Sequence, residues 1–199
     1  TLVGAWKLAM TGERRLVLVA GEPGIGKTRL AAELAARGVD HGGVALHGWC
    51  DEDMGSPFQP WVQALNAFVR SCDAEELATI TAGIGEDLVR LVPELGNRLP
   101  DLAGVEPTDA EAERARVVDA IDVFVERASA SRPLLVVLDD LHWADRATLA
   151  LLLRLVRSDR PGAMLFVGTY RDTDVDRRHP LADALGDLRR EPRASRVAL

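Results

Sequence analysis

The sequence predicts an α/β fold in which a parallel β-sheet lies between two layers of helices. Residues 16–20 form an apolar run, and a glycine-rich loop and an alanine-rich helical segment at 29–37 follow it. Residues 134–138 form a second apolar run and residues 164–169 a third, with a helical pattern at 146–156 between them. Buried strands that alternate with helices are typical of a parallel sheet.

The length, charge and apolar runs of the chain limit which class of protein it can be. The chain has 199 residues, enough for one well-buried domain, which we assign to residues 1–199. A net charge of −7 without a basic run argues against direct binding of nucleic acid by this domain. No apolar run approaches the length of a membrane span and no signal peptide pattern is present, so we expect no membrane contact and a cytoplasmic location.

The two cysteines, Cys50 and Cys72, fit a reducing compartment better than a disulfide framework. The spacing of His47 and Cys50 would suit two ligands of a metal ion. Because no second pair completes such a site, we do not assign a metal there.

The glycine-rich loop, GEPGIGKT at 21–28, matches G-x-x-x-x-G-K-[ST], the Walker A pattern of P-loop NTPases. It stands between a predicted strand and a predicted helix, where loop N–H groups and a helix N-terminus converge on a phosphate. Lys27 is expected to reach the β- and γ-phosphates and the Thr28 hydroxyl to ligate Mg²⁺. The residues predicted to bind the nucleotide are Gly21, Glu22, Pro23, Gly24, Ile25, Gly26, Lys27, Thr28 and Arg29.

Lysine usage supports the same interpretation. Lys7 and Lys27 are the only lysines among 24 basic residues. A compact ammonium on a flexible stem fits between phosphates where a planar guanidinium does not, so the lysine at position 27 favours phosphate binding over a plain glycine turn.

Two carboxylates end the apolar run at 134–138. The carboxyl end of a parallel strand is the edge where such sheets bind ligands. Asp139 is expected to hold Mg²⁺ through its water shell, and Asp140 to orient or deprotonate an attacking water. Arg171, after the run at 164–169, would lie near the γ-phosphate if the strands are ordered as in other P-loop ATPases; the alternative is a plain surface arginine.

The rest of the chain predicts mainly helices. We expect a helix at 2–10, an end of the 29–37 helix at Gly38, and a second strand at 44–50. Segment 73–115 is interpreted as a helical insertion, with short helices at 74–82 and 85–91 and a mobile, polar second half.

After this insertion, a helix is expected from Asp109 to about residue 130, and Asp145 is expected to cap the helix at 146–156. His142 and Trp143 are interpreted as structural rather than catalytic. A helix at 181–188 and a fifth strand at 196–199 complete the prediction.

Three segments in this order carry a family resemblance: GEPGIGKTRLAAELA, LLVVLDDLHWAD and LFVGTYRD. Together they resemble the AAA-like nucleotide-binding domain of STAND-type signalling ATPases, as in the large ATP-binding LuxR-type transcriptional regulators. The resemblance implies a three-layer P-loop NTPase with strand order 5-1-4-3-2. It also implies Mg²⁺ at Thr28 and Asp139, water activation by Asp140 and γ-phosphate sensing by Arg171.

The resemblance further implies that a lid domain would follow the fifth strand, and this region is absent from the chain. Since the chain begins at Thr1 rather than Met, at a point that reads as the middle of the first helix, we expect the chain to be a fragment of a longer regulator. The expected partners are ATP and ADP, other domains of the same protein, and a second copy in nucleotide-dependent self-association.

The leading functional hypothesis is an ATP-binding switch domain that slowly hydrolyses ATP to ADP and phosphate, with Mg²⁺. A second hypothesis is an interaction module that nucleotide stabilises without meaningful turnover. A small-molecule kinase would need an acceptor pocket and an arginine-rich lid, which the sequence does not indicate. A GTPase would need an N/T-K-x-D motif, and neither lysine supplies one.

Overall fold

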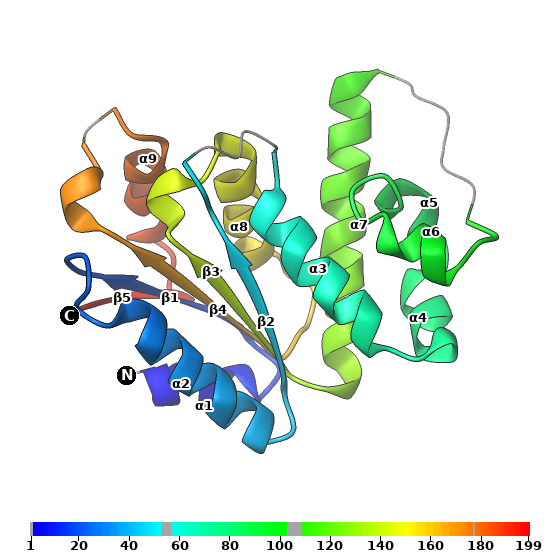
Figure 1. The fold of residues 1–199 in the computed structure, drawn as a ribbon, viewed down its shortest axis with the longest axis horizontal. Helices are drawn as coiled ribbons and strands as arrows, with labels where there is room; N and C mark the ends of the chain where they lie inside the picture. Colours follow the sequence, from blue (N-terminus) through cyan, green and yellow to red (C-terminus); the bar gives the residue numbers. More distant parts are fainter. Residues whose placement is uncertain (1, 53–56, 103–108, 177) are drawn as a thin grey trace.

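A five-stranded parallel sheet forms the centre of the protein (Figure 1). The computed structural model describes residues 2–52, 57–102, 109–176 and 178–199. The strands are β1 (Arg14–Ala20), β2 (Val44–Trp49), β3 (Leu134–Asp139), β4 (Met164–Tyr170) and β5 (Ala194–Ala198). Their order is β2-β3-β4-β1-β5, and every pairing is parallel, which confirms the predicted order 5-1-4-3-2.

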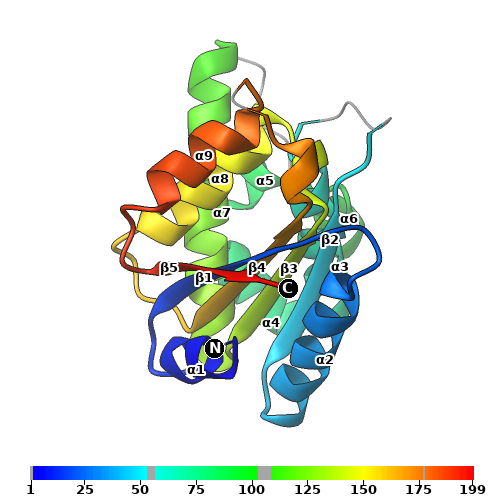
Figure 2. The ribbon, with the colours of Figure 1, turned by 90° about the vertical axis from the view of Figure 1, so that its left-hand side faces the viewer.

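Helices cover both faces of the sheet, so the domain has three layers (Figure 2). One layer consists of α1 (Leu2–Ala9) and α2 (Lys27–Asp40). The other contains α3 (Gln59–Ser71), α7 (Ala110–Ser131), α8 (Arg146–Arg157) and α9 (Pro180–Leu188). In β1, Leu16 and Leu18 face the second layer while Val17 and Val19 face the first, as the two-residue period of a strand requires.

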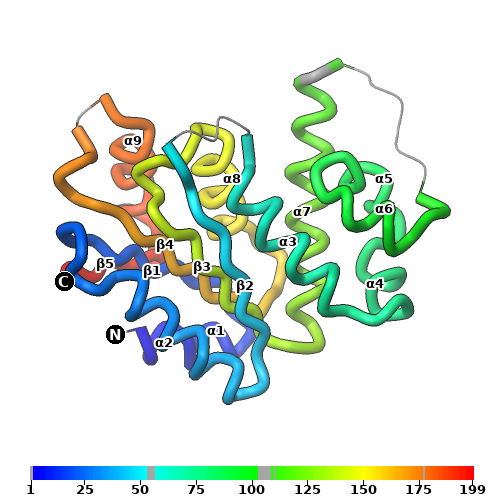
Figure 3. The backbone as a smooth tube through the Cα atoms, viewed as in Figure 1, coloured from blue at the N-terminus to red at the C-terminus, as the bar shows by residue number. Residues whose placement is uncertain are grey.

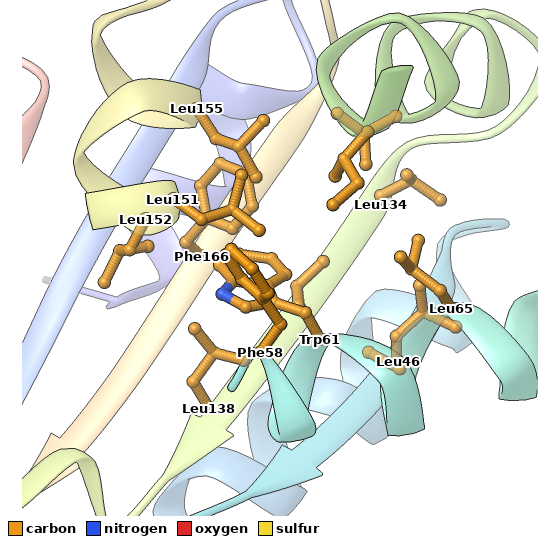
Figure 4. Close-up of a cluster of buried hydrophobic side chains, with 14 of the residues drawn as sticks. Leu46, Phe58, Trp61, Leu65, Leu134, Leu138, Leu151, Leu152, Leu155 and Phe166 are labelled. Carbon is orange, nitrogen blue, oxygen red and sulfur yellow. The ribbon is translucent and has the colours of Figure 1, made fainter. Parts of the chain in front are cut away.

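The larger core lies between the sheet and the second layer (Figure 4). Trp61 of α3 is 1% exposed and its ring meets Phe166 of β4 edge to face, with centroids 5.9 Å apart. The indole Nε1 donates a hydrogen bond to the carbonyl of Thr148 at 3.2 Å, which satisfies its polar atom inside the core. Leucines of three elements surround this pair, namely Leu46, Leu134, Leu138, Leu151, Leu152 and Leu155.

Short helices form the insertion between α3 and α7 (Figure 3). α4 (Ala74–Thr81) and α5 (Gly85–Leu88) agree with the predicted pieces, although α5 ends earlier than expected. A third helix, α6 (Glu94–Arg98), was not predicted; it follows Pro93 and buries Leu95 against the core. These helices contact α3 and α7 rather than the sheet, and residues 103–108 of the predicted insertion lie outside the described part of the chain.

The predicted end of α2 at Gly38 is wrong. The helix continues to Asp40, and the chain turns at Gly42, which has a φ of 80°. A side chain at Gly38 would lie 3.3 Å from Leu135 Cδ1. Gly38 therefore allows close packing of α2 on β3, and this contact offsets the low helix propensity of glycine.

The helices α7 and α8 begin at the aspartates that the sequence predicts. Asp109 accepts a hydrogen bond from the N–H of Ala112, and Asp145 accepts from those of Ala147 and Thr148. Both are N-caps as predicted. In the described ranges, no helix combines the length and the apolar character that crossing a membrane requires.

Gly48 generates a stability prediction. A Cβ at this position would lie 2.0 Å from the carbonyl oxygen of Pro60, so Gly48→Ala would force α3 away from β2. We expect the free energy of unfolding to fall by about 1–3 kcal/mol or more. Denaturant titration, monitored by circular dichroism, measures this free energy of unfolding.

The matched control is Gly186→Ala in α9, where an added Cβ meets no atom within 4 Å. This variant should be more stable by about 0.5–1 kcal/mol, because alanine loses less backbone entropy in a helix. Equal stability of the two variants would contradict the close approach of β2 and α3.

Candidate functional site

The predicted site residues meet at the carboxyl edge of the sheet. The glycine loop follows β1, Asp139 and Asp140 end β3, and Arg171 follows β4. Parallel pairing of these strands brings their carboxyl ends together. The pocket at this edge has a volume of about 240 Å³ and is lined by Pro23, Gly24, Gly26, Lys27, Thr28, Arg29, Asp140 and Arg171.

The loop backbone is shaped to receive an anion. Gly24 and Gly26 have φ values of 75° and 108°, a region that favours glycine. Gly26 is also the N-cap of α2, and no side chain among the described residues caps this helix end. The first N–H groups of a helix lack partners within the helix, so those of α2 suit the binding of a phosphate.

Lys27 lies on the floor of this loop and is 7% exposed. Its Nζ donates hydrogen bonds to the carbonyls of Gly21 and Glu22, each at 3.0 Å. An ammonium group has three donors, so one remains for a phosphate oxygen. By contrast, Ile25 is 52% exposed, and its N–H donates a hydrogen bond to the carbonyl of Glu22 at 3.3 Å.

Asp139 joins the loop helix to the sheet. Its Oδ2 accepts a hydrogen bond from Thr28 Oγ1 at 2.9 Å, and its Oδ1 accepts one from Thr169 Oγ1. The Thr169 hydroxyl in turn accepts from the N–H of Asp140 at 3.0 Å. The carboxylate of Asp139 is thus held between α2 and β4 and is 6% exposed.

These oxygens suit Mg²⁺. The ion prefers oxygen ligands, and proteins commonly supply one or two of them while water and phosphate complete the octahedron. Thr28 and Asp139 offer a hydroxyl and a carboxylate oxygen 2.9 Å apart beside the pocket. A cage of three or more acidic, histidine or cysteine ligands is not found in the described residues.

Asp140 differs from Asp139 in conformation and exposure. It has a φ of 56° and a ψ of 47°, so the chain leaves the strand direction at this residue. Its side chain is 37% exposed and lines the pocket. Adjacent carboxylates therefore occupy different environments, one hydrogen-bonded inside the fold and one facing the pocket.

Arg171 also faces the pocket, with a side chain that is 35% exposed. Its Nη1 lies 3.5 Å from Asp174 Oδ2. This acidic partner belongs to the short helix η2 (Asp172–Asp174) and orients the guanidinium beside the loop.

His142 lies behind Asp140 in the turn η1 (Leu141–Trp143), and its side chain is fully buried. Burial lowers its pKa; the carboxylate of Asp140 opposes this shift, and Arg171 adds to it. The neutral imidazole is therefore the favoured form.

His47 and Cys50 do not converge on a common site with other ligands among the described residues. His47 Nε2 lies 3.9 Å from Asp139 Oδ2, whereas Cys50 is buried. Burial raises the pKa of the Cys50 thiol to about 12, and nearby aspartates contribute to the rise. A protonated thiol is a poor metal ligand.

Sequence reasoning missed three residues near the site: Thr169, His142 as a polar neighbour of Asp140, and Asp174. Thr169 lies in a strand that reads as apolar, and Asp174 lies in a polar loop. Only the position of Asp139 and Asp140 at the end of the neighbouring strand could have drawn attention to Thr169.

Comparison with known protein families identifies the family of this chain. The profile of the AAA ATPase domain family matches residues 1–167. The chain belongs to this family. The AAA ATPase domain is a P-loop nucleotide-binding ATPase domain, which establishes the general class of the site. A search of curated proteins found no match.

Similar solved structures include a chain of Drosophila ORC bound to GC-rich DNA and Cdc6, with 14% identity and a TM-score of 0.45. Another is C. elegans PCH-2, with 16% identity and a TM-score of 0.40. The alignments cover 99% of this chain in both cases, and 56% and 40% of the other chains. This AAA domain therefore spans about half of the length of the ORC chain.

Lys27 generates a binding prediction. Lys27→Arg keeps the charge but places a planar fork in a buried position where one compact donor group reaches two carbonyls. We expect Mg·ATP affinity to fall at least about tenfold, a loss of roughly 1.4 kcal/mol, and nearly as far as in Lys27→Ala. Titration with a fluorescent ATP analogue measures the dissociation constants.

Lys7→Arg is the matched control, since the other lysine of the AAA domain is exposed on α1. Its affinity should equal that of the unmodified chain. Near-native affinity of Lys27→Arg would refute the role assigned to the lysine.

Proposed function

We propose that this AAA domain is an ATP-dependent switch of a signalling or transcriptional regulator, and that it hydrolyses ATP slowly. The observation that carries the proposal is the hydrogen bond between Thr28 and Asp139 beside a pocket that Asp140 and Arg171 line. This edge of the sheet combines a glycine loop suited to phosphate, two oxygens suited to Mg²⁺ and the partly exposed carboxylate of Asp140.

Each side chain has a distinct task in this proposal. The loop N–H groups and Lys27 bind the phosphates, while Thr28 and Asp139 hold Mg²⁺. Mg²⁺ held there would supply positive charge that offsets the negative charge developing on the phosphates during transfer. Asp140 accepts a proton or hydrogen bond from the attacking water, and Arg171 contacts the γ-phosphate.

The exposure of the pocket supports slow hydrolysis. Asp140 and Arg171 keep 37% and 35% of their side-chain surface in contact with solvent. Efficient phosphoryl transfer requires exclusion of water and complete charge stabilisation around the phosphate. We infer that further residues, from other domains of the same protein or from a second copy, complete the site when the switch closes.

The regulator is proposed to be of the large ATP-binding LuxR type. The support is the order and spacing of GEPGIGKT, LLVVLDDLHWAD and LFVGTYRD. In such a protein the nucleotide would govern contacts with the output domain and self-association, while the acidic AAA domain itself would not contact nucleic acid.

Paired substitutions test the proposal. The unmodified chain should release phosphate from Mg·ATP well below about 1 s⁻¹, the low end of common turnover numbers. Asp140→Asn should abolish release yet leave Mg·ATP affinity within about twofold, because a water-orienting group acts mainly in the transition state. Asp139→Asn should weaken Mg²⁺-dependent binding itself.

Asp159→Asn provides the control, since that carboxylate is fully exposed and lies between α8 and the start of β4, whereas the loop follows the end of β1. Binding without any phosphate release by the unmodified chain would favour the static interaction module. Turnover at ordinary enzyme rates would mean that this domain already contains all the residues that efficient ATP hydrolysis requires. Identical binding losses for both aspartate variants would contradict the separate roles.

A further inference from the structure

His142 has an unusual environment for a polar side chain. Its side chain is 0% exposed, and within the described part of the chain neither ring nitrogen has a hydrogen-bond partner. A buried polar atom without a partner typically costs about 1–3 kcal/mol. A hydrophobic side chain would avoid this cost, so the position of the imidazole calls for a functional explanation.

The ring lies between two carboxylates. Nδ1 is 3.8 Å from Asp140 Oδ1, and Nε2 is 3.7 Å from Asp174 Oδ2. Both distances exceed an ordinary hydrogen bond by about 1 Å, a gap that small side-chain rotations can close. Asp174 Oδ2 is also the oxygen that lies 3.5 Å from Arg171 Nη1. Asp140, His142, Asp174 and Arg171 therefore form a continuous row beside the pocket.

The number of N–H groups on the imidazole limits which hydrogen bonds His142 can make to Asp140 and Asp174. A neutral ring carries one N–H and can donate to only one of the two carboxylates. Arg171 offsets the charge of Asp174. Among the described residues, the group near Asp140 Oδ1 is the ring of His142. The N–H is therefore best placed on Nδ1, directed at Asp140.

We propose that His142 is a positioning residue that donates Nδ1–H to Asp140 and holds this carboxylate toward the attacking water. The Arg171–Asp174 pair sets the direction of the ring. The inference rests on the proposed hydrolysis. It assigns His142 no contact with ATP, so the residue should affect turnover and leave nucleotide affinity unchanged.

Three substitutions at position 142 test this role. His142→Phe fills the volume without a donor, and we expect turnover to fall about 10- to 100-fold, as for other residues that orient a functional group. The amide nitrogen of His142→Asn can take the place of Nδ1, so this variant should recover part of the rate. The amide of His142→Gln reaches instead toward the place of Nε2, so its rate should stay low.

Three measurements accompany each variant: steady-state phosphate release, affinity for a fluorescent ATP analogue, and the melting temperature. Val156→Ala serves as the stability control. Val156 is 0% exposed in α8, next to Leu155, whose carbonyl accepts a hydrogen bond from Arg14 at the opposite edge of the sheet.

Full turnover by His142→Phe would overturn the inference, and so would equal losses in the Asn and Gln variants. Losses that follow melting temperature as in Val156→Ala would reduce His142 to a packing residue. If His142→Phe does not fold, the difference in turnover between His142→Asn and His142→Gln alone tests the inference. Absence of turnover in the unmodified chain, by contrast, would refute the proposed hydrolysis and remove the basis of the inference.

Discussion

The hydrogen-bonded carboxylate of Asp139 connects the parts of this domain on which the site depends. It accepts from Thr28 at the start of α2 and from Thr169 in β4, while its own backbone continues β3. Three elements that are distant in sequence are thereby aligned at one edge of the sheet. Because the carboxylate is 6% exposed, losing one of these donors would leave a buried charge with too few partners.

A rigid part and an open part meet at this carboxylate. On the rigid side, α2 packs closely on β3 through Gly38, and Lys27 is tied to two loop carbonyls. On the open side, Asp140 leaves the strand in a left-handed conformation and Arg171 is held by an exposed acid. In the proposed function, phosphate and metal binding would use the rigid side and hydrolysis would use the open side.

The helical layer beyond the sheet serves stability more than chemistry. Trp61 and the leucines around Phe166 bury the second face, and α4, α5 and α6 extend this layer along α3 and α7. The structure places the insertion away from the glycine loop, as Figure 1 shows. In the proposed switch, the insertion would contact other domains without disturbing the pocket, whereas the loop, Asp140 and Arg171 would meet a group that closes over the nucleotide.

The sequence alone determined the strands and the helix caps, because these depend on local patterns: apolar runs, and Asp109 and Asp145 before helices. It also predicted a phosphate-binding loop from the glycines before Lys27. Strand order was inferred through family resemblance and then confirmed by the pairing. Only the tertiary structure decided that α2 passes through Gly38, that Thr169 bonds Asp139, and that His142 lies between Asp140 and Asp174. The reason is physical: burial and side-chain partners arise between segments 30 or more residues apart, as Thr169 and Asp139 are, and no local pattern encodes them.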